Sequence, residues 1–566
     1  MHFMKRLLIL VVAIAALALP VFAQSAPDLT ALAPYFPETT PLYASFRTDG
    51  AVIDDLEAVR AHIADALPDF MIGDETFAEM LDGLGPLTGS GDTFAEAVQP
   101  WLGASAAVGP LSLEQLMNNE NDAAFLIALQ ITDRAQAQAF FASGMGSSAN
   151  VEETDTYTLL TPSSPSADPA GIYIDDSVLL LTNKPEVLPV NGMISPSLAD
   201  NAGFQEAWTS LPADAYAVFT YMDYAAFMQA SVDQMIAASP RDAAQFEALL
   251  PLVGTFKDLG LGMTLLDGRS LTMDVNLSWD AEGMMGMVPA SPSPYDPAFA
   301  EYLPAGTALA VQGANLAAYW DQMLANLSTL GEVQQGADGA NAAEMIAGLE
   351  FAIQGVTGLD LQDDVLSWMT GQYAIGMSLD LPTLTDARNA EDALPRALQF
   401  AFVVENTTGE GAQALVAGVS SWLTQFAEAT PSEEMTVTEE TIGGAPALVI
   451  SIESRGMLEP FQIVIGGDEN VFVIGTPAMA QAALAPDGSL SSDAGYQDAV
   501  AVALDGAVQL VYANGDFLNR LIELSLFGRP ANRSELAVGP LFSSLSISDT
   551  VGEENVTARL VMTIAE

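Results

Sequence analysis

Short apolar segments recur along the chain in the patterns of buried strands, and they occur in two similar sets. In the first half, Phe125–Leu129 is a continuous apolar run, and Ile172–Ile174 and Ser177–Leu181 flank a turn at Asp175-Asp176. The second half repeats this succession in three segments: Phe400–Val404, Gln462–Ile465 and Val471–Ile474. Patterns of this kind predict a strand followed by a hairpin in each half. Helical patterns follow the first run of each set, around Ala135–Phe141 and Gly411–Phe426.

Internal similarity relates the two halves residue by residue. Three pairs of segments carry it, the first two at an offset of 267 residues and the third at 292: Phe36–Leu42 with Leu303–Leu309, Phe94–Trp101 with Leu361–Trp368, and Ala202–Ala207 with Ala494–Ala499. A constant offset over more than one segment is typical of a duplicated unit. In both halves a strand then runs into a helix, for which Asp223 and Asn514 are the expected N-caps.

The fold class follows from this succession. Alternating closing strands at Leu271–Leu277 and Val556–Met562, with helices between strands, predict an α+β fold with largely antiparallel sheets. We therefore expect two tandem homologous domains, each a largely antiparallel sheet with packed helices. The predicted segments are a signal peptide over 1–23, a first domain over 24–288, a Pro/Ser-rich linker over 289–297 and a second domain over 298–566.

The N-terminus has the pattern of a secretory leader. Lys5 and Arg6 precede the apolar stretch Leu7–Leu19, and Val21-Phe22-Ala23 is a small-residue cleavage site. We predict cleavage after Ala23 and a secreted, periplasmic or cell-surface location, with no transmembrane span in the mature chain. The alternative is a leader that stays as an anchor helix.

Charge narrows the classes of partner. The chain has 73 Asp and Glu residues against 16 Lys and Arg, for a formal net charge of −57. Nucleic acids and anionic membranes need clustered basic residues, so neither is an expected partner. Solubility in a salty exterior explains the acidity, and diffuse binding of divalent cations is the alternative.

Residues for catalysis are scarce. The chain has no cysteine and two histidines, of which only His62 would remain after cleavage. His62 lies on a helix pattern beside the apolar positions Leu56, Val59 and Ile63, where a surface histidine with satisfied hydrogen bonds is expected. A Ser-Lys pair would need Lys184 or Lys257, and Lys184 lies in a turn and has no lysine counterpart in the second half.

Metal and nucleotide motifs are equally weak. Asp360–Asp364 is the densest acidic cluster, and carboxylates at a helix N-terminus explain it. Gly260-Leu261-Gly262 begins a nucleotide-binding pattern, but Leu265 replaces the third glycine, so we interpret the segment as a strand edge. We therefore nominate no catalytic, cofactor-binding or metal-ligating residue and expect no cofactor.

The repeated Leu/Phe-Pro openings at Phe36 and Leu303, each followed by a tryptophan and a strand, resemble the bacterial family called domain of unknown function 3352 in two tandem copies. Trp101 and Trp368 are the repeated landmarks. Gly103 has no equivalent at Thr370, and the nearest glycine is Gly371. The resemblance implies an exported bacterial envelope protein without an assigned activity.

The sequence therefore predicts an exported, non-catalytic bacterial envelope or extracellular protein that acts by binding. Its partner would be another envelope protein or an apolar small molecule. Met284–Val288 is an apolar run beside the linker, either an adaptable contact surface or a packed strand end. Two alternatives stay open: a carrier of an apolar small molecule, and a hydrolase using an unidentified acidic pair.

Overall fold

The computed structural model describes most of the chain between residues 27 and 565. The described residues are 27–66, 93–117, 123–145, 149–163, 170–189, 194–213, 215–241, 243–247, 250–266, 269–281, 292–320, 322, 348, 350–351, 354–355, 358–380, 383, 393, 397–429, 435–453, 460–527 and 540–565. The predicted signal peptide, Met284–Val288 and the first three linker residues lie outside them. The chain divides into two compact units: unit 1 is Met1–Gly283 with Glu554–Thr557, and unit 2 is Met284–Glu553 with Ala558–Glu566.

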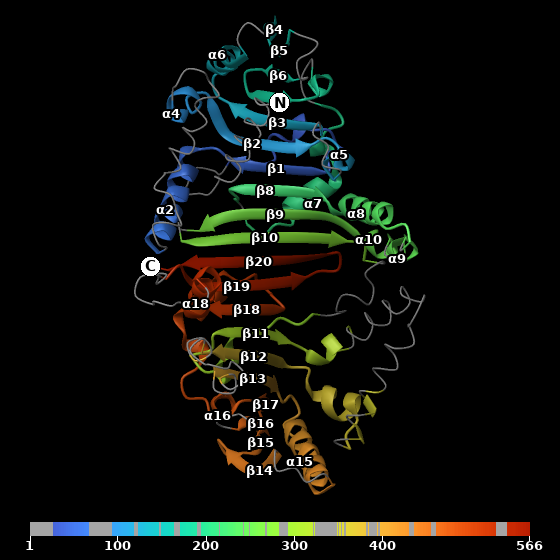
Figure 1. Cartoon of the computed structure of the whole chain (residues 1–566), viewed down its shortest axis with the longest axis vertical. Helices are drawn as coiled ribbons and strands as arrows, with labels where there is room; N and C mark the ends of the chain where they lie inside the picture. The colour runs from blue at the N-terminus through green and yellow to red at the C-terminus, as the bar shows by residue number, and fades with distance from the viewer. Residues whose placement is uncertain are drawn as a thin grey trace. The chain divides into compact units, whose positions relative to one another are not determined.

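Unit 1 is built on a sheet whose neighbouring strands are all antiparallel (Figure 1). The order across this sheet is β4 (Ala149–Glu153), β5 (Thr158–Pro162), β6 (Gly171–Ile174), β7 (Val178–Thr182), β3 (Phe125–Ile131), β2 (Leu102–Pro110), β1 (Leu42–Arg47), β8 (Val218–Asp223), β9 (Phe256–Leu266) and β10 (Ser270–Trp279). The predicted hairpin at Asp175-Asp176 is β6–β7.

The strands of unit 2 follow an order that corresponds to that of unit 1 strand for strand (Figure 1). It is β14 (Met435–Ile442), β15 (Ala445–Ile452), β16 (Phe461–Gly467), β17 (Val471–Gly475), β13 (Leu398–Glu405), β12 (Gln372–Leu379), β11 (Leu309–Ala314), β18 (Gln509–Asn514), β19 (Phe542–Val551) and β20 (Asn555–Ile564). The register corresponds too. Ala44 pairs with Val108 in unit 1, and Val311 pairs with Ile375 in unit 2. The prediction of antiparallel sheets with helices is confirmed.

Helices connect and cover the strands. In unit 1 they are η1 (Ala33–Tyr35), α2 (Gly50–Ala66), α4 (Phe94–Ala97), α5 (Leu113–Met117), α6 (Arg134–Met145), η4 (Pro185–Val187), η5 (Leu198–Asp200), α7 (Ala202–Thr209), α8 (Tyr224–Ala238), α9 (Ala243–Glu247) and α10 (Leu250–Val253). In unit 2 they are η6 (Pro297–Tyr302), η7 (Leu361–Val365), η8 (Leu366–Trp368), α15 (Gly411–Ala429), α16 (Pro477–Leu484), η9 (Leu490–Ser492), α17 (Ala494–Val502) and α18 (Gly515–Phe527).

The expected caps begin α8 and α18. The carboxylate of Asp223 accepts a hydrogen bond from the Ala226 N–H at 2.8 Å, and the amide oxygen of Asn514 accepts one from the Phe517 N–H at 2.9 Å. Each bond satisfies one of the N–H groups that lack a partner in the first helical turn. Both caps are therefore confirmed.

Trp101 and Trp368 occupy the same kind of site in their units. Both are buried, and each indole N–H donates to the backbone carbonyl four residues earlier, Ala97 at 2.7 Å and Asp364 at 3.0 Å. Trp101 packs against Phe140 and Phe141 of α6, whereas Trp368 packs against Phe472 of β17. These tryptophans are core residues that close one face of each sheet.

The glycine after each tryptophan also has a counterpart, shifted by one position. A Cβ on Gly103 would lie 2.8 Å from the backbone of Gln130, and one on Gly371 would meet the carboxylate of Glu405. Gln130 then accepts a hydrogen bond from the Ala104 N–H at 3.1 Å, and Glu405 accepts one from the Gln372 N–H at 2.8 Å. Close approach of a neighbouring side chain explains both glycines.

The interpretation of Gly260-Leu261-Gly262 as a strand edge is wrong, because β9 is paired on both sides, with β8 and β10. A Cβ on Gly260 would lie 2.5 Å from the Ala207 carbonyl oxygen of α7, and one on Gly262 would lie 2.4 Å from the ring of Tyr216. These glycines exist because a helix and a tyrosine pack directly on the strand.

Candidate functional site

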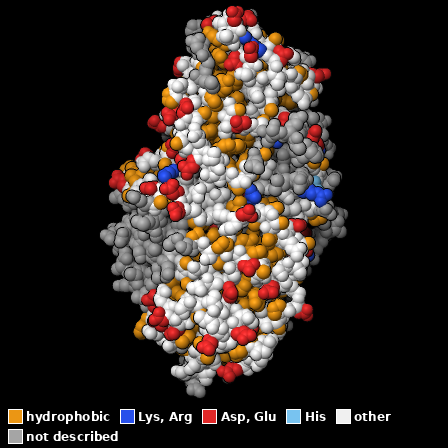
Figure 2. All heavy atoms as spheres, turned by 180° about the vertical axis from the view of Figure 1, so that it is seen from behind, with side chains coloured by type: hydrophobic (Ala, Val, Ile, Leu, Met, Phe, Trp, Pro, Cys, Tyr) orange, Lys and Arg blue, Asp and Glu red, His pale blue; other side chains and the backbone are white. Residues whose placement is uncertain are grey.

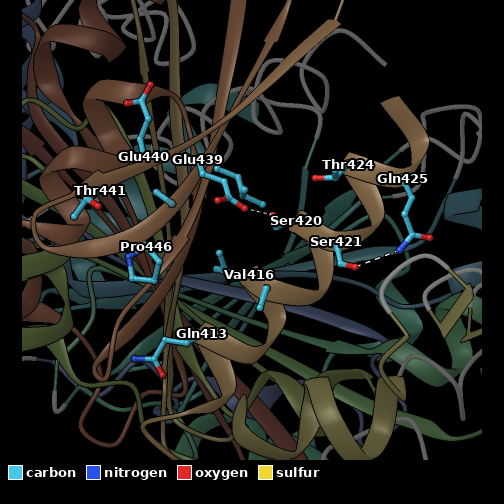
Figure 3. A pocket seen from close by; sticks show the side chains of 13 residues that line it. Gln413, Val416, Ser420, Ser421, Thr424, Gln425, Glu439, Glu440, Thr441 and Pro446 are labelled. Carbon is cyan, nitrogen blue, oxygen red and sulfur yellow. Dashed lines mark hydrogen bonds between the residues drawn. The ribbon is translucent and has the colours of Figure 1, made fainter. Parts of the chain in front are cut away.

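An open groove of about 950 Å³ lies between α15 and the β14–β15 hairpin of unit 2 (Figure 3). Its polar lining consists of Gln413, Ser420, Ser421, Thr424 and Gln425 on α15 and Glu439, Glu440 and Thr441 on β14, above Val416, Ala417, Pro446, Ala447 and Leu448.

Hydrogen bonds within the groove occupy part of this polar lining. The Ser420 hydroxyl donates to the Glu439 carboxylate at 2.6 Å, and the Gln425 amide donates to the Ser421 hydroxyl at 3.3 Å. Figure 3 shows Glu439 directed at the helix and Glu440 directed away from it. The groove can therefore hydrogen-bond a polar group, but it presents a single carboxylate toward α15 rather than a pair.

A second surface lies on the face of the unit 2 sheet that α15 covers at one end. One row of directly paired residues crosses eight strands on this face, from β19 to β15, and we call it the apolar row: Ile547, Val511, Val311, Ile375, Phe402, Ile474, Ile465 and Leu448. Direct cross-strand partners point to the same face of a sheet. The row is thus one continuous apolar stripe.

Burial along the apolar row is uneven. Leu448 is buried and belongs to the same core cluster as Leu415 and Val416 of α15. Ile375 is 39% exposed although β12 is an interior strand with neighbours on both sides. An isoleucine at such a position is normally covered. Ile375 therefore presents apolar surface to solvent, whereas Ile547, Val511 and Val311 are half-buried.

Unit 1 has the corresponding row, and the end of it that corresponds to the α15 end of unit 2 is packed. Leu261, Thr220, Ala44, Val108, Ile127, Leu181, Ile172 and Leu160 are direct partners across the equivalent eight strands. Ile127, Leu181, Ile172 and Leu160 are buried in the cluster that contains Trp101 and Phe141. Val108, the counterpart of Ile375, is half-buried.

His62 is not the satisfied surface residue that the sequence predicts. Its ring Nε2 is buried and has no hydrogen-bond partner among the described residues, and the same holds for Oδ2 of Asp55 on α2. Burial raises the pKa of Asp55 to about 6, against the opposing attraction of Arg47. Seven residues of helix separate His62 from Asp55, about 10 Å along the axis, too far for both to act on one atom.

The other candidates have structural surroundings. The backbone N–H of Lys184 donates to the Thr182 hydroxyl at 3.0 Å, in the turn before η4. Asp360 caps the first turn of η7 by accepting from Gln362 and Asp363, at 2.9 and 3.0 Å, as expected of an acidic helix start. Within the described ranges, no three Asp, Glu or His side chains are placed to hold a metal ion.

Charge is distributed rather than concentrated. On the face shown in Figure 2, acidic side chains are scattered over the surface, basic ones are few, and apolar side chains reach the surface between them. Every helix in the described part of the chain is too short or too polar to cross a membrane.

Comparison with protein families identifies the chain's relatives. The family model described as "Protein of unknown function (DUF3352)" matches residues 6–560. The chain belongs to this family. The match spans nearly the whole chain of this DUF3352 member as a single stretch. It does not by itself divide the chain into two copies.

No curated protein matches this DUF3352 member. A solved structure titled "Structure of crystal form IV of TP0453" matches 45% of this chain and 81% of its own, at 10% identity and a TM-score of 0.21. A similarity this low supports no conclusion about fold or function.

Proposed function

We propose that this DUF3352 member is an exported, non-catalytic protein that binds an apolar molecule through unit 2. The observation that carries the proposal is Ile375, an isoleucine exposed in the middle of an interior strand and flanked by Val311 and Phe402. Exposed apolar area of this kind is costly in water and typical of binding surfaces. A carrier of an apolar small molecule is the form of binding that this surface favours.

The proposal includes two tandem homologous domains. Three observations support duplication: the same strand order, the same register at Ala44–Val108 and Val311–Ile375, and the offset of 267 residues that two pairs of segments share. A duplicated binding protein can keep one copy as scaffold while the other acquires a ligand. Export rests on the leader sequence, Lys5 to Ala23.

Native mass spectrometry of the mature chain, purified gently from its own source, tests the binding. We expect an added mass of small-molecule size that is lost on denaturation. Ile375→Asp should abolish the added mass, because a carboxylate in the apolar row opposes an apolar ligand. Leu116→Asp is the matched control, since Leu116 is 40% exposed but lies on α5 of unit 1.

A wild-type chain that carries no ligand would contradict the carrier proposal. An added mass that both variants retain would place the ligand elsewhere than on the apolar row.

A further inference from the structure

A polar row lies beside the apolar row on the same face of unit 2. It consists of Tyr373 on β12, Gly313 on β11, Gln509 on β18 and Asp549 on β19, which are direct partners in that order. Each member is two residues along its strand from a member of the apolar row, for example Tyr373 from Ile375 and Asp549 from Ile547. That spacing places the two rows about 7 Å apart.

Gly313 lets Tyr373 reach across its neighbouring strand. A Cβ at Gly313 would lie 2.5 Å from the Tyr373 hydroxyl, so the ring lies over β11 and extends toward β18 and β19. The ring of Tyr319 packs edge-on against it, with centroids 6.1 Å apart and an interplanar angle of 89°. Two tyrosines and Gln509 therefore gather on the side of the sheet that carries Asp549.

Asp549 is the unusual member of the polar row. It is half-buried, and burial raises its pKa to about 6, with no hydrogen bond from a described residue to offset the lost hydration. Burial also raises the pKa of Tyr319 and Tyr373, with a further contribution from the charge of Asp549. The carboxylate thus lies within electrostatic range of two neutral hydroxyls, and none of the salt bridges between described residues includes it.

The fold does not need these polar groups. At the same register in unit 1, the row reads Ala106, Phe46, Val218 and Met263, all apolar. The same sheet therefore forms with apolar side chains at every position. Polar side chains in unit 2 cost stability by desolvation, which is typical of residues retained for binding.

We propose that unit 2 binds an amphiphile whose chain lies on Ile547, Val511, Val311 and Ile375 and whose ammonium headgroup lies at Asp549, Tyr319 and Tyr373. The inference rests on the proposed function, since it names the ligand class of the same face. A carboxylate favours a cationic head, and tyrosine rings and hydroxyls add cation–π and hydrogen-bond contacts. The net charge of −57 also attracts cations and repels anionic amphiphiles.

Calorimetric titration of the mature full-length chain with decylammonium and with decanol at 0.15 M salt tests the headgroup. At pH 7.5 we expect decylammonium to bind about tenfold more tightly than decanol, the worth of one charged hydrogen bond. The preference should fall as the pH drops below about 6, because Asp549 then becomes protonated. Tyr319 and Tyr373, whose pKa values are raised by burial and by the charge of Asp549, stay neutral over this range.

Asp549→Asn should remove the preference for decylammonium and leave decanol binding unchanged. Asp505→Asn is the matched control, because it makes the same change in net charge at an exposed turn of unit 2. Equal binding of both probes to the wild-type chain, or a preference that survives in Asp549→Asn, would overturn the headgroup assignment and leave the apolar site standing. Failure of both probes to bind would contradict the proposed function itself. The pH series needs no variant, so the test stands even if one fails to fold.

Discussion

The two units place very different side chains on nearly the same backbone. In unit 1, Phe46 is large and its partner Ala106 is small, whereas in unit 2 the large residue is Tyr373 and the small one is its partner Gly313. Beside these pairs, Val218 and Met263 of unit 1 correspond to Gln509 and Asp549 of unit 2. The two units therefore keep the same register and the same pairing of a large with a small residue, while the chemistry of the side chains changes.

The same comparison separates positions that packing explains from positions that packing leaves unexplained. Gly260 and Gly262 on β9 correspond to Ser546 and Ser548 on β19, which are buried. Ser548 accepts a hydrogen bond from the Leu504 N–H at 3.0 Å. Small size is kept at both places because a helix packs closely on each strand, α7 in unit 1 and α17 in unit 2. In the polar row, Gly313 makes room for the buried Tyr373, but packing gives no such explanation for Gln509 and Asp549.

The largest predicted loss of stability tests whether Trp101 and Trp368 contribute equally to the cores of their units. Trp101→Ala and Trp368→Ala should each destabilise the protein by about 3–5 kcal/mol, because both leave a large cavity and an unpaired carbonyl. Urea denaturation followed by circular dichroism measures this. A cost below about 1 kcal/mol for either variant would break the equivalence, since the two indoles make the same hydrogen bond.

A smaller predicted loss of stability tests whether the paired residues Gly313 and Tyr373 share one space. Gly313→Phe should destabilise unit 2 by about 1–3 kcal/mol, since its Cβ would lie 2.5 Å from the Tyr373 hydroxyl. Adding Tyr373→Ala recreates the unit 1 pair and should recover part of the loss. A double-mutant cycle should give a favourable coupling of about 1–3 kcal/mol. Additive costs would show that the two positions do not share one space.

The smallest effect concerns pH and the polar row. The pKa of Asp549 is raised from 3.8 to about 6, so ionising it in the folded state opposes folding as the pH rises from about 4 to 6. Asp549→Asn should therefore stabilise the protein at pH 7 by about 1–2 kcal/mol, discounted for partial exposure, and have little effect at pH 4. Thermal unfolding at both pH values measures this. Equal effects at the two pH values would show that desolvation is not the cause.

Met263→Asp is the reciprocal control in unit 1. It places a carboxylate at the position equivalent to Asp549 and should destabilise the protein more at pH 7 than at pH 4. Neutral behaviour would mean that this face of unit 1 is more hydrated than that of unit 2.

Much of the backbone could be predicted from the sequence. The hairpin at Asp175-Asp176, the helix over 411–429 and the caps Asp223 and Asn514 depend on nearby residues, so local patterns predict them. The acidic segment Asp360–Asp364 could be predicted as a helix start for the same reason. The candidate surface could not be predicted from local patterns, because its members come from four strands that are far apart in the sequence: β12, β11, β18 and β19.

The sequence by itself determined the repeated succession of elements, because periodicity and capping act within a few residues of each position. Only the tertiary structure decided which strands became neighbours, and hence that Tyr373, Gln509 and Asp549 share one row beside Ile375. It also decided that Gly260 and Gly262 lie under a helix and a tyrosine rather than at an edge, and that Nε2 of His62 is buried. Burial and partnership are properties of the space between distant segments, and that space exists only once the sheet has formed.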